Sequence, residues 1–297
     1  MRREGTRELL FLGLLSAAVC LLFLVIFWEE DVGKLYEANK NTAAAGKSDS
    51  GYSCTRIDLE TSDDEAVEID LSQIDGDYTI TEAGRYLLYG DYEGQICVDA
   101  EEQIIHFILR DVRIDSKSGS AIDVRTAGKV VITLEENTTN IIQDNAHYRG
   151  REDGDAAIYS ACDLTVNGAG LLKVYGLYDH GIHSRDMVKI LGGDIFVQAK
   201  GNGIQGNDGL LLCPSFLSVE SEENGLYSKK TGDEKKGAID ISGGEISIIS
   251  GAYGISSSQN LYVHDCSVWS NAVLGTFSVE GEEYFMEGCL VNEQVSP

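Results

Sequence analysis

Positively charged residues are scarce in this chain. Its 297 residues contain 23 lysines and arginines against 49 aspartates and glutamates, which gives a net charge of −26. Three arginines and two glutamates, a net +1, lie between Met1 and Trp28, so the remainder carries −27. Because nucleic acids and anionic lipids are themselves negative, this charge disfavours both as direct partners. An acidic surface also keeps many exported proteins soluble without any ligand.

Cysteine motifs for metal binding are absent. Seven cysteines occur and no two form a CxxC pair, so a structural zinc site has little support. The six beyond Cys20 would permit disulfides in an exported protein, but they occupy different positions of the repeat described below, which favours buried free thiols. A transition-metal site is not expected either. His180 and His183 are only three residues apart, and no third His or Cys occurs at a matching position.

Long apolar runs are missing, with one exception near the N-terminus. Residues 9–28 contain no charge, which is enough to cross a hydrocarbon core of about 30 Å as a helix. Arginines precede the run and acidic residues follow it, so the N-terminus is expected inside the cell and the rest outside. A cleaved signal peptide is the alternative, but no small-x-small cleavage site follows the run. We expect a cytoplasmic tip and membrane anchor over 1–28 and a flexible linker over 29–55.

Helical periodicity and proline are both lacking in the rest of the chain. The two prolines stand at 214 and 297, and apolar residues alternate in short bursts without a helical period. Isoleucine or leucine recurs instead at a nearly constant spacing, in anchor positions occupied by Ile158, Ile182, Ile204, Leu226 and Ile255. The last spacing is longer because it includes a charged loop around Lys230 to Lys236.

Each repeat offers three short strands separated by glycine-rich corners. A unit of about 22 residues cannot close a core alone, so neighbouring units must stack and place equivalent residues in columns about 4.8 Å apart. A leucine-rich solenoid would need helical segments, and a β-sandwich would not give so regular a period. The prediction is an all-β, right-handed parallel β-helix over residues 56–297, with Ile57 to Tyr92 and Val273 to Pro297 as end caps. A corner with positive φ is expected at the glycines before four anchors, Gly181, Gly203, Gly225 and Gly254.

Several segments resemble a known bacterial family. They read AAIYSACDLTVNGAGLLKV from residue 156, HGIHSRDMVKILGGDIFVQA from residue 180 and NGIQGNDGLLL from residue 202. TITEAGRYLLYGDYEGQICVDAE and VVITLEENTTNIIQD look like the N-terminal portion of the same family. The family is that of carbohydrate-binding β-helix domains, and the resemblance spans roughly Gly76 to Trp269. It implies an exported protein that binds calcium and a sugar polymer, with the architecture of calcium-dependent polysaccharide lyases.

The chain departs from the family pattern in four places. Cys162 stands where the first of two aspartates is usual, and Tyr253 replaces the aspartate of the last Asp-Gly-Ile unit. Asn202 and Asn224 replace that aspartate in two further units. These departures leave the number and affinity of the calcium sites open.

Aspartates recur at fixed positions in adjacent repeats. Stacked carboxylates repel one another unless a cation or a proton intervenes, and Ca²⁺ takes six to eight oxygen ligands. The alternative is that these residues cap turns by accepting nearby N–H groups, which Asp and Asn do often. The predicted calcium ligands are Asp163, Asp186 and Asp208 in one column, Asn202 and Asn224 in a second, and Asp155 and Asp179 in a third.

A further column follows the anchors by one residue, and strand alternation points it outward. Aromatic faces with polar tips suit sugar rings, although tyrosine is common on any strand surface. The predicted carbohydrate-binding residues are Tyr159, His183, Gln205 and Tyr227.

Three functions remain open from the sequence. The first is a non-catalytic, calcium-dependent module that binds a polysaccharide with uronic acid units, since bound Ca²⁺ can bridge carboxylates to an acidic surface. Lysines in the charged loop, Lys229, Lys230, Lys235 and Lys236, would add attraction. The second is a polysaccharide lyase acting by calcium-assisted β-elimination, for which Lys200, Lys189 or Arg185 is a conceivable base. The third is a structural surface solenoid without a sugar ligand.

Overall fold

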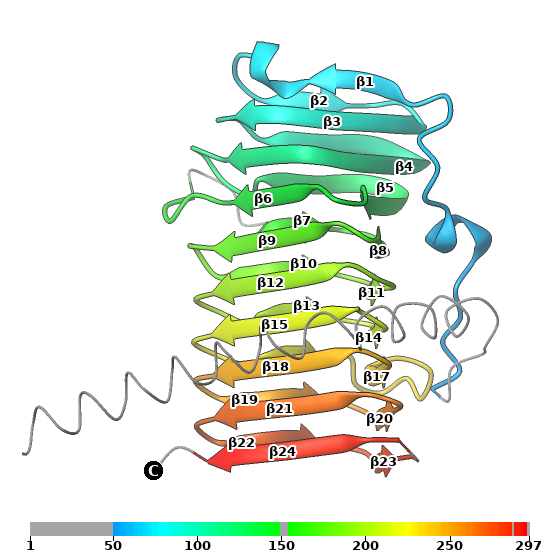
Figure 1. The fold of residues 1–297 in the computed structure, drawn as a ribbon, viewed down its shortest axis with the longest axis vertical. Helices are drawn as coiled ribbons and strands as arrows, with labels where there is room; N and C mark the ends of the chain where they lie inside the picture. Colours follow the sequence, from blue (N-terminus) through cyan, green and yellow to red (C-terminus); the bar gives the residue numbers. More distant parts are fainter. Residues whose placement is uncertain (1–49, 149–153, 287, 296–297) are drawn as a thin grey trace, which may run out of the picture. The chain divides into compact units, whose positions relative to one another are not determined.

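The computed structural model describes residues 50–148, 154–286 and 288–295. The predicted membrane anchor and most of the predicted linker lie outside these residues. No helix within the described residues has the length and apolar character that a membrane crossing requires. The described part is a parallel β-solenoid whose strands stack in successive coils (Figure 1). This confirms the β-helical fold predicted from the repeat.

Each coil contributes strands to as many as three faces, and every pairing between coils is parallel. The first face, which contains the anchors, consists of β2 (Tyr78–Ile80), the start of β4 (Ile96–Asp115), the start of β5 (Ile122–Leu134), β7 (Ala156–Ser160), β10 (His180–Ser184), β13 (Ile204–Gly206), β16 (Leu226–Ser228), β19 (Tyr253–Ser257) and β22 (Gly275–Val279).

The second and third faces are built in the same way. The second consists of β1 (Val67–Asp70), β3 (Gly84–Tyr92), the middle of β4, the end of β5, β8 (Leu164–Gly168), β11 (Met187–Ile190), β14 (Gly209–Leu212), β17 (Ala238–Ser242), β20 (Leu261–His264) and β23 (Glu283–Phe285). The third consists of the ends of β3 and β4, β6 (Thr139–Gln143), β9 (Leu171–Gly176), β12 (Asp194–Ala199), β15 (Phe216–Ser221), β18 (Glu245–Ser250), β21 (Ser267–Ala272) and β24 (Leu290–Val295).

The five anchors form one interior column. Ile182 is the register partner of both Ile158 and Ile204, and Leu226 is the partner of both Ile204 and Ile255. All five side chains are fully buried. Burial of an Ile or Leu side chain stabilises a fold by roughly 1.5–3 kcal/mol, so a repeated column of them provides a continuous core. The spacing of the repeat therefore predicted both the register and the core.

The glycines before the anchors have a different role from the one predicted. Their φ angles lie outside the positive region, so left-handed backbone is not the reason for glycine. A Cβ atom at Gly203 would lie 2.1 Å from Cγ1 of Val219 and 2.7 Å from the carbonyl oxygen of Gly225. The prediction of positive φ was wrong, and close packing against the third face excludes a side chain instead. Positive φ occurs at the corner between the second and third faces, as at Gly168 (94°) and Gly193 (77°).

Residues 50–60 form an N-terminal strap that lies along the outer side of the second face (Figure 1). The strap includes the 3-10 helix η1 (Arg56–Leu59); a second one, η2 (Leu71–Gln73), lies near β3. Tyr52 donates its hydroxyl to the carbonyl oxygen of Asp208 (2.9 Å) and accepts from the backbone N–H of Ala238 (3.0 Å). The predicted linker thus ends in residues that pack on the solenoid.

The strap is fixed by a buried charge cluster. Asp58 is fully buried, and its two carboxylate oxygens accept from Lys129 Nζ at 2.7 Å and Lys189 Nζ at 3.1 Å. Thr165 Oγ1 donates to the same carboxylate at 2.6 Å. Burial alone would raise the pKa of Asp58, but the hydrogen bonds from Lys129, Thr165 and Thr55 outweigh it and hold the pKa far below its ordinary value.

The cysteines of the described residues are free thiols, as the sequence indicated. Four are buried, and the other two, Cys54 and Cys289, are half-buried. Burial raises the pKa of the Cys266 thiol to about 12, with smaller contributions from the negative charge of its neighbours. A thiol with a pKa this high is protonated near neutral pH.

Candidate functional site

The outward column predicted to bind carbohydrate runs in register along the first face. His183 pairs with Tyr159 on one side and Gln205 on the other, and Gln205 pairs with Tyr227. All four side chains lie outside the apolar core. Three of them are nevertheless almost fully covered, with exposed fractions of 4% for Tyr159, 5% for His183 and 4% for Gln205. The column thus forms a packed polar floor rather than an open platform.

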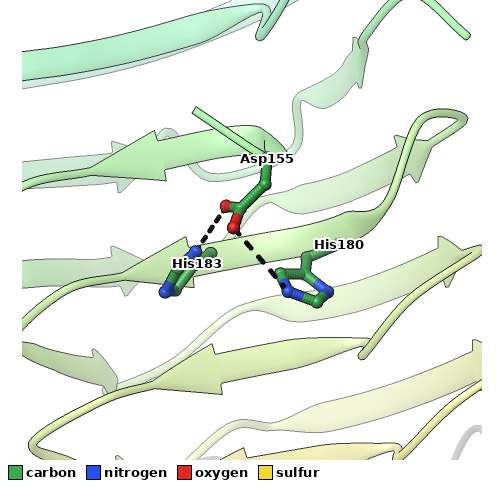
Figure 2. A group of neighbouring side chains, drawn as sticks. All are labelled: Asp155, His180 and His183. Atoms are coloured by element: carbon green, nitrogen blue, oxygen red, sulfur yellow. Dashed lines mark hydrogen bonds and ion pairs between the residues drawn. The ribbon is translucent and has the colours of Figure 1, made fainter. Parts of the chain in front are cut away.

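The best-defined polar cluster stands at the edge of this floor (Figure 2). Asp155 precedes β7, whereas His180 and His183 belong to β10 in the next coil. Oδ1 of Asp155 lies 2.5 Å from Nδ1 of His183, and Oδ2 lies 3.9 Å from Nε2 of His180. One ligating atom from each side chain lies within 4.8 Å of the others, so the three can hold a metal ion. This cluster was not evident from sequence, because no third His or Cys stands near the two histidines and its third member, Asp155, belongs to the preceding coil.

The charges in this cluster are shifted by burial and by each other. Burial alone would raise the pKa of Asp155, but the hydrogen bond with His183 and the nearby histidines hold it below its usual value. Burial lowers the pKa of His180 to about 4, so this imidazole is neutral near pH 7. Asp179, whose Oδ1 lies 3.2 Å from Nδ1 of His180, has a raised pKa because of burial and the negative charge of Asp155.

Amide side chains continue the network along the corner that precedes the first face. Nδ2 of Asn202 donates to Oε1 of Gln205 (2.9 Å), and Nε2 of Gln205 lies 3.0 Å from Nε2 of His183. Oδ1 of Asn202 accepts from the backbone N–H and the side chain of Asn224, and Oδ1 of Asn224 accepts from the backbone N–H of Tyr253. Oδ1 of each asparagine thus accepts hydrogen bonds from neighbouring coils, as a residue that caps a turn does.

The residues predicted to bind calcium lie at two different corners. Asp155, Asp179, Asn202 and Asn224 precede the strands of the first face, whereas Asp163, Asp186 and Asp208 follow them. The five residues of β10 separate the two corners by about 13 Å, at roughly 3.3 Å per residue. Ca²⁺ binds oxygen at about 2.3–2.6 Å, so one ion cannot bridge these two sets.

The acidic row, defined as Asp163, Asp186 and Asp208, does bring negative charges together. Burial raises the pKa of Asp186, and the charges of Asp208 and Asp163 raise it further. Asp208 is 8% exposed and binds Lys236 from the loop between β16 and β17, with Lys230 Nζ 3.9 Å away. Repulsion within the row is thus partly neutralised by cations of the chain itself.

Two tyrosines at the other corner form an exposed stack. The rings of Tyr148 and Tyr178 lie 4.1 Å apart at 17°, and Tyr178 is 46% exposed. Tyr148 donates to Oδ2 of Asp144 (2.7 Å), whose Oδ1 accepts from the backbone N–H of Leu177. Burial raises the pKa of Asp144 to about 6. The sequence did not single out this tyrosine pair, because its members lie in loops outside the repeating strands.

The basic residues considered for a lyase are not equivalent. Lys189 is 4% exposed and is held by Asp58 and the carbonyl oxygen of Ser53, which makes it part of the strap. Arg185 and Lys200 are exposed and lie at different corners of one coil, Arg185 after β10 and Lys200 after β12. Arg125, which the sequence did not single out, lies beside the floor and donates to Asp123 at 2.8 Å.

Comparison with known proteins agrees with the fold. A carbohydrate-binding domain-containing protein of Acetivibrio thermocellus is 30% identical over 226 residues, covering 74% of this chain and 79% of that protein. The structure of the polysaccharide lyase-like protein from C. thermocellum, gadolinium derivative, matches with a TM-score of 0.72 at 27% identity, over 76% of this chain and 98% of that one. The family model of carbohydrate-binding domain-containing proteins matches residues 74–282. The chain therefore belongs to this carbohydrate-binding domain family.

Proposed function

We propose that this chain is a non-catalytic, calcium-dependent protein that binds an acidic polysaccharide along its first face. Family membership supports a carbohydrate ligand. The observation that carries the proposal is the Tyr148–Tyr178 stack, which presents an exposed ring beside the polar floor. Sugar rings offer C–H patches to aromatic faces and hydroxyl groups to polar side chains, so stack and floor together suit one glycan chain.

Calcium explains how so acidic a protein would hold an acidic polymer. The part of the chain after Trp28 carries −27, which repels polyuronate unless a cation intervenes. The acidic row supplies carboxylates, the ligands that Ca²⁺ prefers, and their mutual repulsion favours a bound cation. Bound Ca²⁺ inverts the local field, and uronate carboxylates and water would complete its coordination shell.

The tyrosine stack allows a test with a matched control. Tyr284 is 37% exposed and stacks on Tyr262 at 4.9 Å and 7°, but on the second face. We expect Tyr178→Ala to weaken retention on immobilised polygalacturonate about 5- to 150-fold, as for loss of one stacking residue worth roughly 1–3 kcal/mol, and Tyr284→Ala to retain wild-type binding. Loss of binding in Tyr284→Ala but not in Tyr178→Ala would instead place the binding site on the second face.

The calcium requirement is tested in the same assay. Wild-type retention should be strong with Ca²⁺ and lost with a chelator, because the acidic row then repels the glycan. Equal retention under both conditions would refute calcium dependence. No retention of any acidic or neutral glycan with Ca²⁺ present would instead support the structural solenoid.

A polysaccharide lyase is the second candidate, favoured by the description of the structural relative as polysaccharide lyase-like. β-Elimination needs a base that is deprotonated near the operating pH. Lys189 is tied to Asp58, which leaves exposed Lys200 and Arg185 as the candidates named from sequence. Ultraviolet absorbance of unsaturated product, with polygalacturonate and Ca²⁺, distinguishes the two functions: we expect no product above the background rate.

We also propose that residues 9–28 anchor the protein in the cell membrane with the solenoid outside. The charge-free run and the arginines before it support this orientation. Protease added to intact cells should then degrade the solenoid, and the protein should remain with membranes after a high-salt wash. Recovery of the whole protein in the cytosol would contradict the proposal.

A further inference from the structure

We infer that Asp155, His180 and His183 form a binding site for a divalent transition metal such as Zn²⁺, separate from the acidic row. Two imidazoles and one carboxylate are a common ligand set for Zn²⁺. Calcium takes oxygen ligands almost exclusively, so two nitrogen donors argue against it at this position. The inference is independent of any glycan and goes beyond the proposed calcium-dependent binding.

The three side chains lie near enough to hold such an ion after a modest rearrangement. Zn²⁺ binds His nitrogen and Asp oxygen at about 2.0–2.2 Å, which places tetrahedral ligand atoms about 3.3–3.5 Å apart. The Asp155–His183 distance of 2.5 Å and the Asp155–His180 distance of 3.9 Å lie on either side of this value. The two distances end on different oxygens of Asp155, and all three ligating atoms lie within 4.8 Å of one another, so side-chain movements on the order of 1 Å would bring them to coordination distance.

The neighbours of His180 offer the support that a zinc-bound imidazole needs. Metal coordination at Nε2 requires the proton to be on Nδ1, where a carboxylate or carbonyl group usually accepts it. Oδ1 of Asp179 lies 3.2 Å from Nδ1 and can accept this proton. In the metal-free arrangement Nδ1 instead accepts from the backbone N–H of Asn202 at 2.9 Å. Zinc binding thus selects the tautomer in which Nδ1 donates to Asp179, and the ring must turn away from the backbone N–H of Asn202, which is a donor and cannot accept the proton.

His183 also has a hydrogen-bond acceptor near its second ring nitrogen. Zinc would take the place of the proton between its Nδ1 and Asp155, which moves the remaining ring proton to Nε2. Oδ1 of Asn207 lies 3.4 Å from Nε2 and can accept it once the amide of Gln205 turns away, because Nε2 of Gln205 lies 3.0 Å from the same ring nitrogen in the metal-free arrangement. Both histidines therefore have an acceptor for the second nitrogen, which is the usual arrangement around bound zinc.

The two histidines of the site are buried, whereas the aspartate faces solvent. The side chains of His180 and His183 are 10% and 7% exposed, whereas that of Asp155 is 38% exposed. An ion can enter past Asp155 and keep a fourth position for water, as catalytic and ligand-binding zinc sites do. Gly201 keeps the inner wall compact, since a Cβ there would lie 1.9 Å from Oδ1 of Asp179 and 2.4 Å from Nδ1 of His180.

Calorimetric titration of the chelator-treated, full-length protein with Zn²⁺ tests the inference in the absence of glycan. We expect one Zn²⁺ per chain, loss of this binding in His180→Gln and His183→Gln, and a 10- to 100-fold weaker affinity in Asp179→Asn. The matched control is His147→Gln, because His147 is an exposed histidine outside the cluster. Its affinity should equal that of the wild type.

Two further measurements test whether these three side chains are the ligands. Zn²⁺ should raise the unfolding temperature of the wild type and of His147→Gln but not of Asp155→Asn, a conservative change that tests the site if a histidine variant fails to fold. The Co²⁺-loaded protein should lack the charge-transfer band of cobalt–thiolate bonds, which separates this site from the free cysteines. Zinc binding that survives in the histidine variants, a thiolate band, or no stoichiometric binding by the wild type would each overturn the inference.

Discussion

Replacing Asp58 with alanine should destabilise the solenoid more than any surface substitution. Asp58 is fully buried beneath the strap, and its partners Lys129 and Lys189 have side chains only 12% and 6% exposed. Removal of the carboxylate leaves two ammonium groups without a counter-ion in a place that water hardly reaches. Breaking a buried ion pair from one side costs about 3–5 kcal/mol. We expect a loss of this size in the free energy of unfolding.

Urea unfolding followed by circular dichroism measures this loss directly. Asp115→Ala is the control, because Asp115 pairs with Lys117 at the surface (2.9 Å), where ion pairs contribute little. Truncation of residues before Asp58 should produce part of the same loss, since the strap and the cluster act together. A decrease below about 1 kcal/mol for Asp58→Ala would refute the view that this cluster fixes the strap, because that size is typical of an exposed pair.

The same cluster predicts a pH dependence with a definite sign. The folded-state pKa of Asp58 lies below its unfolded value near 3.9, so the folded state favours the ionised carboxylate. Its stabilisation is present in full above about pH 5 and is lost as the pH falls through the folded pKa. Asp58→Asn should therefore flatten the acid limb of the stability curve; an unchanged acid limb would contradict the argument.

Three further predictions follow from local geometry. Gly203→Ala should lower the free energy of unfolding by about 1–3 kcal/mol, because the new Cβ meets Val219 at 2.1 Å; unchanged urea unfolding would refute this. The pKa of Asp144 is raised to about 6, so its folded form prefers the proton and stability should fall as pH rises from 4 to 6; Asp144→Asn should abolish that slope in thermal unfolding. Lys236→Ala should strengthen Ca²⁺ binding several-fold in calorimetry, since it removes a cation that competes for Asp208; weaker binding would contradict the proposed site.

The features that repeat were predictable from sequence. Parallel strands in adjacent coils align residues at the repeat interval, so the nearly constant spacing of the anchors was sufficient to place Ile158, Ile182 and Ile204 in one column. The outward column followed from strand alternation for the same reason. The burial of three members of this column did not follow from strand alternation. Corner residues such as Asp155 and Asn202 contact them, and the repeat spacing does not indicate the shape of the corners.

Features that do not repeat escaped prediction. Asp58 meets Lys189 across 131 positions of sequence, and nothing in the repeat connects the strap to the second face. Asp155 and His183 are 28 residues apart, a separation larger than that between Ile158 and Ile182, the anchors of their two coils. The corner before β7 therefore shifts Asp155 toward His183 in a way that strand register alone does not indicate. The four glycine positions before the anchors were identified correctly, but steric closeness rather than backbone torsion explains all four.

The central claim is that a glycan lies along the first face, between the tyrosine stack and the acidic row. A crystal structure of the protein with an oligogalacturonide and Ca²⁺ tests it most directly. The account predicts a sugar ring against Tyr178 and Ca²⁺ bound by Asp186. Sugar bound instead against Tyr262 and Tyr284 on the second face, with the first face unoccupied at saturating ligand, would contradict it.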